Sequence, residues 1–135
     1  MAYAPGSISG GHFNPAVTLA LRVRGELDTR ETLAYVAVQL VAAIGRVLLA
    51  HAMFGPPLLQ PGIHARTGAA QWLSEGVATA GLLLTILLGQ RARPAAIPAL
   101  VASYIFAAYW FTASTSFANP AVTVARALTR TFAGI

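Results

Sequence analysis

The pentapeptide Asn-Pro-Ala-Val-Thr occurs twice in the chain, from Asn14 to Thr18 and again from Asn119 to Thr123. Proline is favoured at the first position of a helix, and asparagine directly before it is a good helix N-cap. Each copy therefore predicts the start of a helix. The first turn of a helix carries unpaired N–H groups and a partial positive charge. Two such ends that face each other across a narrow tube would repel cations and protons and offer hydrogen bonds to neutral molecules.

The residues just before each motif add hydrogen-bonding groups to this picture. Residues 10–13 and 115–118 are expected to be non-helical, with backbone carbonyls that line the tube. The side-chain amides of Asn14 and Asn119 can each donate a hydrogen bond to a passing solute. Non-helical backbone at membrane depth is tolerated only where it lines water or is buried in protein. One Asn-Pro-Ala alone is only a good helix start, whereas two copies in an apolar chain favour a pore.

The composition favours lipid rather than water as the solvent. Charged residues make up 10% of the chain and apolar residues 56%, whereas about 25% of a soluble protein is charged. All nine basic residues are arginines scattered between apolar segments, which argues against a nucleic-acid partner. The absence of cysteine excludes disulfides and thiolate metal sites. His12, His51 and His64 lack metal-ligand spacing, so neither a metal nor a cofactor is predicted, and no nucleophile–base pair indicates an enzyme.

Three segments, residues 32–54, 72–90 and 94–113, are apolar enough to cross a bilayer, which takes about 20 helical residues. Polar side chains inside them, such as His51, should face protein or water, because lipid-exposed charge is costly. Three spans between the two motifs bring the second motif in from the opposite side of the membrane. The half-helices then point their N-termini at each other, as in proteins built from inverted repeats.

The distribution of arginine predicts an orientation. Arginines cluster before the first span and again at Arg91 and Arg93, between the second and third spans, whereas the connection between the first two spans holds only Arg66. By the positive-inside rule, the arginine-rich connections are cytoplasmic. Arg126 and Arg130 would then lie near the outer side, which argues against this orientation.

The segment from Ser9 to Thr18 resembles the first signature loop of the aquaporin, or major intrinsic protein, family, and the segment from Ser116 to Ala121 resembles the second. The resemblance covers essentially the whole chain and points to bacterial aquaglyceroporin-like members. It implies an all-α membrane protein with an aquaporin-like inverted-repeat bundle and no cofactor. It further implies a homotetramer in the lipid bilayer, multi-pass in the bacterial inner membrane, that passes water and small neutral solutes.

The resemblance also implies site residues. Glu75 and Gln39 lie where family members carry the same residues, and we expect both to act as structural buttresses, with Glu75 accepting hydrogen bonds from loop amides. His12 is expected to contribute a backbone carbonyl. The residues expected to line the pore or set its selectivity are Gly11, His12, Asn14, Pro15, Ala16, Ala107, Ser116, Asn119, Pro120, Ala121 and Val122.

Two of these positions depart from the usual pattern of the family. Val122 stands where an arginine usually follows the second Asn-Pro-Ala, and Ala107 stands where many water channels carry histidine. Both changes remove polar bulk, so we expect a wider and less polar filter that suits glycerol-like solutes or neutral metalloid acids such as arsenous acid. Arg126, one turn beyond Val122, is either a substitute filter cation or an anchor to neighbouring helices or headgroups.

The chain also has fewer helices than the family pattern of six spans and two half-helices. Residues 1–25 are expected to hold the end of the second helix, the first loop and its half-helix, and residues 114–135 the second loop and its half-helix. The whole chain, 1–135, is then a partial channel domain, truncated at both ends. It is a channel, a non-conducting fragment of one, or a modulatory subunit that co-assembles with intact subunits. Arg46 lies where close helix packing is expected. It is either a damaging replacement or a side chain that pairs with an acid or extends to the membrane interface.

Overall fold

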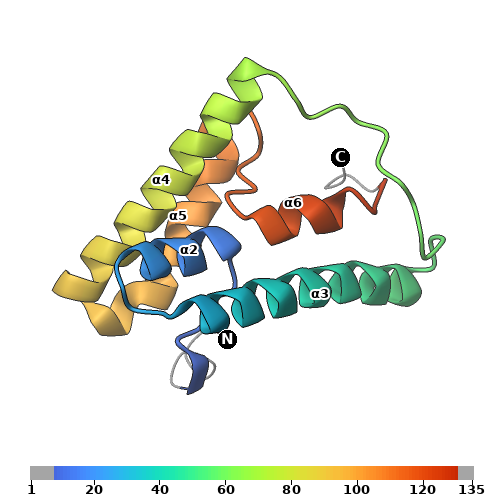
Figure 1. The fold of residues 1–135 in the computed structure, drawn as a ribbon. Coiled ribbons are helices and arrows are strands. Elements are labelled where there is room, and N and C mark those ends of the chain that lie inside the picture. The colour runs from blue at the N-terminus through green and yellow to red at the C-terminus, as the bar shows by residue number, and fades with distance from the viewer. Residues whose placement is uncertain (1–7, 131–135) are drawn as a thin grey trace. The chain divides into compact units, whose positions relative to one another are not determined.

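The computed structural model describes residues 8–130, which contain helices and no strand. The elements are α2 (Pro15–Val23), α3 (Thr29–Phe54), α4 (Ala69–Ala92), the 3₁₀ turn η1 (Pro94–Ala96), α5 (Ile97–Phe111) and α6 (Pro120–Arg126) (Figure 1). This confirms the expected all-α class. The described residues divide into two compact units, one of residues 8–12 and 67–118, the other of residues 13–66 and 119–130.

The second unit is built on α3, against which both short helices α2 and α6 pack. α3 begins with a capping box, in which the Asp28 carboxylate accepts from the Glu31 N–H at 2.7 Å and Glu31 accepts from the Asp28 N–H at 3.2 Å. It ends at Gly55, whose φ of 83° suits the left-handed cap that glycine adopts without strain. Local capping signals at both ends therefore account for the length of this helix.

The first unit pairs α4 with α5, which lie side by side (Figure 1). The hydroxyl of Tyr104 donates to the Ala78 carbonyl at 2.9 Å. A Cβ on Gly81 would clash with the same hydroxyl oxygen, so the tyrosine occupies the space that a side chain at position 81 would need. Ala78 and Leu82 form the centre of a small buried cluster beside this contact. Small residues on α4 thus allow the two helices to approach closely.

Three helical stretches are long and apolar enough to cross a membrane, Thr29–Phe54, Ala69–Ala92 and Pro94–Phe111. They correspond to the expected spans 32–54, 72–90 and 94–113, with shifted ends. The first starts earlier than expected because Asp28 caps it. The third ends at Phe111 rather than residue 113, because the backbone of Thr112 becomes extended.

The expected terminal segments 1–25 and 114–135 fall partly outside the described residues. In the described part of the first segment, residues 8–9 are helical, a non-helical stretch follows, and α2 comes after it. Of the second, α6 is a helix of seven residues.

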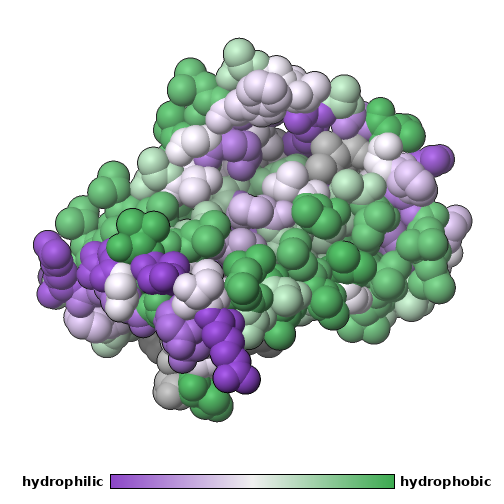
Figure 2. Space-filling model, in the orientation of Figure 1, coloured by the Kyte–Doolittle hydropathy of each residue, from purple (hydrophilic) through white to green (hydrophobic). Residues whose placement is uncertain are grey.

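Large apolar side chains are exposed along the long helices. In Figure 2 apolar residues form the visible surface along much of α3. Exposed side chains on this helix include Leu33, Val38, Val41 and Leu49. Water would disfavour such a surface, whereas the hydrocarbon of a bilayer accepts it. Together with the three candidate spans, this surface indicates a protein that crosses the membrane several times.

Candidate pore site at the paired half-helices

The two Asn-Pro-Ala motifs lie together in the second unit. The side-chain amide of Asn119 donates to the backbone carbonyl of Phe13 at 2.9 Å. Phe13 directly precedes Asn14, and α2 and α6 are also in contact. One direct hydrogen bond therefore joins the N-terminal ends of two helices that are far apart in sequence.

Both helix starts are organised by their asparagines. The Asn14 side-chain oxygen accepts from the Ala16 N–H at 2.9 Å. The Asn119 oxygen accepts from the N–H groups of Ala121 at 3.1 Å and Val122 at 3.3 Å. Each asparagine is extended and is followed by proline at the first helical position. Because an amide nitrogen carries two protons, Asn119 keeps one N–H beyond the one that it gives to Phe13.

α3 holds the first half-helix through a buried polar contact. The Gln39 amide donates to the Thr18 hydroxyl at 3.0 Å, and the same hydroxyl lies 3.2 Å from the Asn14 carbonyl, to which it donates. Thr18 is 0% exposed. Gln39, expected as a buttress, thus contacts α2 within the motif itself.

In the first unit, α4 holds the loop that precedes the second motif. The Glu75 carboxylate accepts from the Phe117 N–H at 2.9 Å and from the Ala118 N–H at 2.7 Å. The resemblance to the family predicts such bonds for Glu75, but Ser74 and Gln71 on the same helix were not predicted to hold the loop. The Ser74 hydroxyl accepts from the Ala113 N–H at 2.8 Å, and the Gln71 amide donates to the Ala113 carbonyl at 3.2 Å. The signal was present in the sequence, because positions 71, 74 and 75 share one face of a helix.

The loop held by α4 has a backbone conformation that side chains disfavour. Thr115, Ser116 and Ala118 have positive φ values of 58°, 46° and 44°. Residues other than glycine pay for this left-handed region in steric repulsion, most of all β-branched ones. Within residues 8–130, the Ser116 hydroxyl is buried at 2% exposure and has no hydrogen-bond partner. Strain combined with an unpartnered polar group is typical of functional segments.

We expect replacement of Thr115 with glycine to stabilise the protein by about 1 kcal/mol, because glycine adopts the φ of 58° without steric repulsion. The measurement is the unfolding free energy in mixed detergent micelles. Thr115→Ala is the matched control, since it removes the hydroxyl and methyl groups but keeps the Cβ that is strained at this φ. Equal stability of the glycine and alanine variants would contradict the strain argument.

The structure distributes the remaining predicted residues over both units. Ala107 is exposed on α5, whereas Val122 is half-buried on α6, so the two filter positions belong to different units. Gly11 and His12 are half-buried in the first unit, and a Cβ on Gly10 would lie 2.8 Å from the Nε2 of His12.

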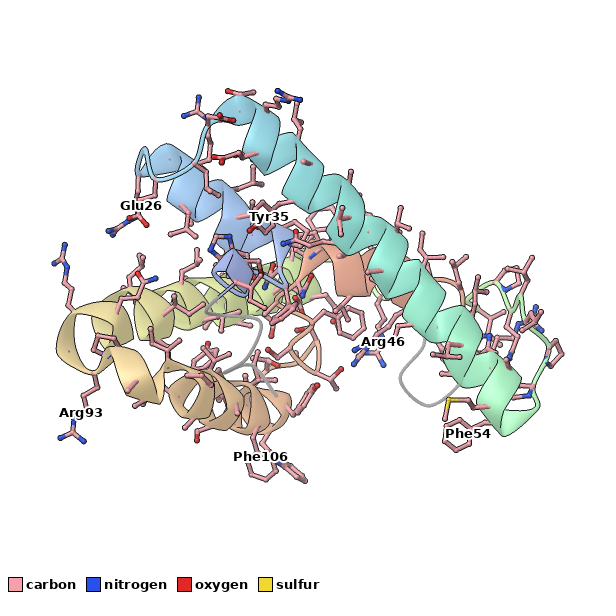
Figure 3. All side chains as sticks on the ribbon, turned by 90° about the horizontal axis from the view of Figure 1, so that it is seen from below. Glu26, Tyr35, Arg46, Phe54, Arg93 and Phe106 are labelled. Carbon is pink, nitrogen blue, oxygen red and sulfur yellow. The ribbon has the colours of Figure 1, made fainter. Side chains whose placement is uncertain are left out.

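Arg46 and Arg126 both lie in the second unit. Arg46 is exposed on α3, where Figure 3 draws its side chain extending away from the helix. Arg126 is half-buried in the last turn of α6. No group of three or more histidine, cysteine or acidic residues that could hold a metal ion occurs in the part of the chain that the structure describes.

Three apolar helices long enough to span a bilayer and two short helices that meet at their N-termini define a multi-pass α-helical membrane protein with paired half-helices. The family model of the major intrinsic protein matches residues 1–106. The chain therefore belongs to the major intrinsic protein family, whose members are channels and not enzymes.

Individual relatives agree with this assignment. The chain is 57% identical over 130 residues to aquaglyceroporin AqpS of Rhizobium meliloti, an alignment that covers 96% of this chain and 56% of the relative. It is 39% identical over 90 residues to aquaporin Z of Brucella melitensis, covering 65% of this chain and 40% of the relative. The chain thus spans little more than half the length of the first relative. No solved structure matches it.

Proposed function

We propose that the chain supplies the paired half-helices and three spanning helices of a passive channel for water and small neutral solutes. The observation that carries this proposal is the hydrogen bond between Asn119 and Phe13, because it brings two positively polarised helix ends together. Such a pair disfavours cations and protons by its field. Neutral solutes with hydroxyl groups can still accept from the second N–H of Asn119 and donate to carbonyls of the loops.

The selectivity proposal rests on two positions with small apolar side chains. Val122 and Ala107 offer no charge and no ring at the positions where many water channels narrow the path. A wider, less polar filter suits glycerol-like solutes or metalloid acids such as arsenous acid. The name of the relative from Rhizobium meliloti, an aquaglyceroporin, supports the same class of solute.

Assembly and location are part of the same proposal. A closed path needs protein on every side of the half-helices, because each unpaired backbone group that faces lipid costs about 2–7 kcal/mol. We propose a homotetramer in a bacterial inner membrane. The second candidate, a modulatory subunit that co-assembles with intact subunits, is favoured by the large apolar side chains exposed on α3.

The test is solute flux into proteoliposomes that contain the chain, measured by light scattering for glycerol and water and by arsenic content for arsenous acid. Glycerol and arsenous acid should enter these proteoliposomes faster than they enter empty vesicles.

In the Val122→Arg, Ala107→His variant, we expect glycerol flux to fall about tenfold or more, because the larger side chains narrow the filter. Water flux without glycerol flux would contradict the wide filter. No flux alone, with altered flux through co-reconstituted intact subunits, would favour the modulatory subunit.

A further inference from the structure

His51 lies near the C-terminal end of α3 and uses both ring nitrogens within the second unit. Its Nδ1 lies 2.8 Å from the Leu58 carbonyl oxygen, and its Nε2 lies 2.9 Å from the Thr129 hydroxyl. His51 is 3% exposed and Thr129 5% exposed. Sequence reasoning predicted only that this histidine would face protein or water. The structure makes it the junction of three segments.

The partners determine which way the hydrogen bonds run. A carbonyl oxygen can only accept, so Nδ1 must carry a proton. In the neutral ring Nε2 is then the acceptor, and Thr129 donates its hydroxyl proton to it. The result is one directed chain of hydrogen bonds from Thr129 through His51 to the Leu58 carbonyl. Its geometry depends on a planar ring that holds two partners at a fixed separation.

Two further bonds join the same segments. The Gly62 N–H donates to the Ala127 carbonyl at 2.8 Å, and the Arg130 Nε donates to the Pro61 carbonyl at 3.0 Å. We call the set of residues 58–62, residues 127–130 and His51 the C-terminal bracket. The loop and the residues that follow α6 bond each other, and the ring of His51 joins both to the long helix.

This arrangement bears on α6, which is too short to be stable by itself. Its seven residues form fewer hydrogen-bonded turns than an isolated helix needs in solution. Its N-terminal end is tied at Asn119 to Phe13, and the C-terminal bracket ties the residues just after its C-terminal end. Val122 lies between these two ties. A change at either tie should therefore tilt or shift the helix that carries Val122.

We propose that His51 is a positioning residue, which fixes the C-terminal end of α6 through Thr129 and thereby sets the width of the path at Val122. His51 does not touch the solute in this scheme. The proposal rests on the proposed channel function for its consequence for selectivity, but the positioning itself is a property of the fold. It can therefore be tested without conduction.

The test uses the absence of cysteine from the chain. A single Val122→Cys replacement provides a probe, whose rate of alkylation by a small maleimide in proteoliposomes reports the exposure of position 122. Adding Thr129→Val, which keeps the side-chain shape and removes the hydroxyl, should raise this rate about fivefold, the factor expected for loss of one hydrogen bond. Thr129→Ser restores a hydroxyl and should return the rate to the starting value.

The matched control is Thr85→Val, because the Thr85 hydroxyl donates only within its own helix, to the Gly81 carbonyl at 2.8 Å. It should leave the alkylation rate unchanged. His51→Asn, whose amide can replace the Nδ1 donor but not reach Thr129, should behave as Thr129→Val does. In the chain with native Val122, Thr129→Val should also raise the flux of a larger polyol relative to glycerol by a similar factor.

The outcomes separate the two proposals. An unchanged alkylation rate in Thr129→Val at equal protein yield overturns the positioning role, as does a serine variant that behaves like the valine variant. A raised rate that serine reverses, in a chain that carries no solute at all, supports the positioning role and contradicts the channel function of the chain alone. If His51→Asn fails to accumulate, the valine and serine variants at position 129 decide the question.

Discussion

Replacement of Glu75 with glutamine is expected to lower the free energy of unfolding by about 3 kcal/mol, the largest loss that we expect from a change of so few atoms. The carboxylate accepts two backbone N–H groups, from Phe117 and Ala118. A glutamine amide has one oxygen, so one bond loses its ionic partner and the other becomes a contact between two donors. The strained loop at Thr115 and Ser116 then loses the group that holds it.

The measurement is unfolding of the purified protein in mixed micelles, with loss of solute flux as a second readout. Ser74→Ala is the matched comparison, because it removes a single neutral bond to the same loop, at Ala113, and should cost about 1 kcal/mol. If Glu75→Gln costs no more than Ser74→Ala, the carboxylate is not the main support of the loop.

The second large effect is expected at Asn119. Asn119→Ala removes the N-cap of α6 and the bond to Phe13, so we expect a loss of about 2–3 kcal/mol. Asn119→Asp keeps an acceptor for the N–H groups of Ala121 and Val122. It also places a carboxylate oxygen against the Phe13 carbonyl, so two acceptors face each other and the half-helices should separate. Both variants should abolish flux if the channel proposal holds.

Unfolding in mixed micelles measures both variants, and Asp28→Ala is the control for capping alone. Asp28 caps α3 at an exposed site without a bond to either half-helix, so its loss should cost about 1 kcal/mol. If the bond to Phe13 stabilises the fold, Asn119→Asp should destabilise the protein more than Asp28→Ala does, although aspartate is a good N-cap. Wild-type stability of Asn119→Asp would show that the bond to Phe13 contributes little.

Most of the helices could be predicted from local sequence. Asn14 and Asn119 followed by proline predict two helix starts, and both are present with the expected side-chain caps. The ends of the spans were less predictable, because an apolar run does not show where capping begins. Asp28 extends α3 and Thr112 ends α5 earlier than hydropathy alone indicates.

Long-range partners were harder to predict from the chain. Glu75 was assigned to the loop amides only through the resemblance to a family, and Ser74 and Gln71 were missed because neutral polar residues in an apolar helix have many uses. From the sequence alone, His51 could be identified only as a polar residue within an apolar span. Its partners Leu58 and Thr129 lie in segments without a pattern, so no periodicity could connect them.

The two Asn-Pro-Ala motifs show which features the local sequence determines and which it does not. The sequence by itself determined that two helices begin at Pro15 and Pro120, because proline geometry and asparagine capping act over a few neighbouring residues. Only the tertiary structure decided that the Asn119 amide reaches the Phe13 carbonyl and that α3 holds both short helices. Those contacts depend on how the helices pack in space, and the local proline and capping signals do not determine that packing.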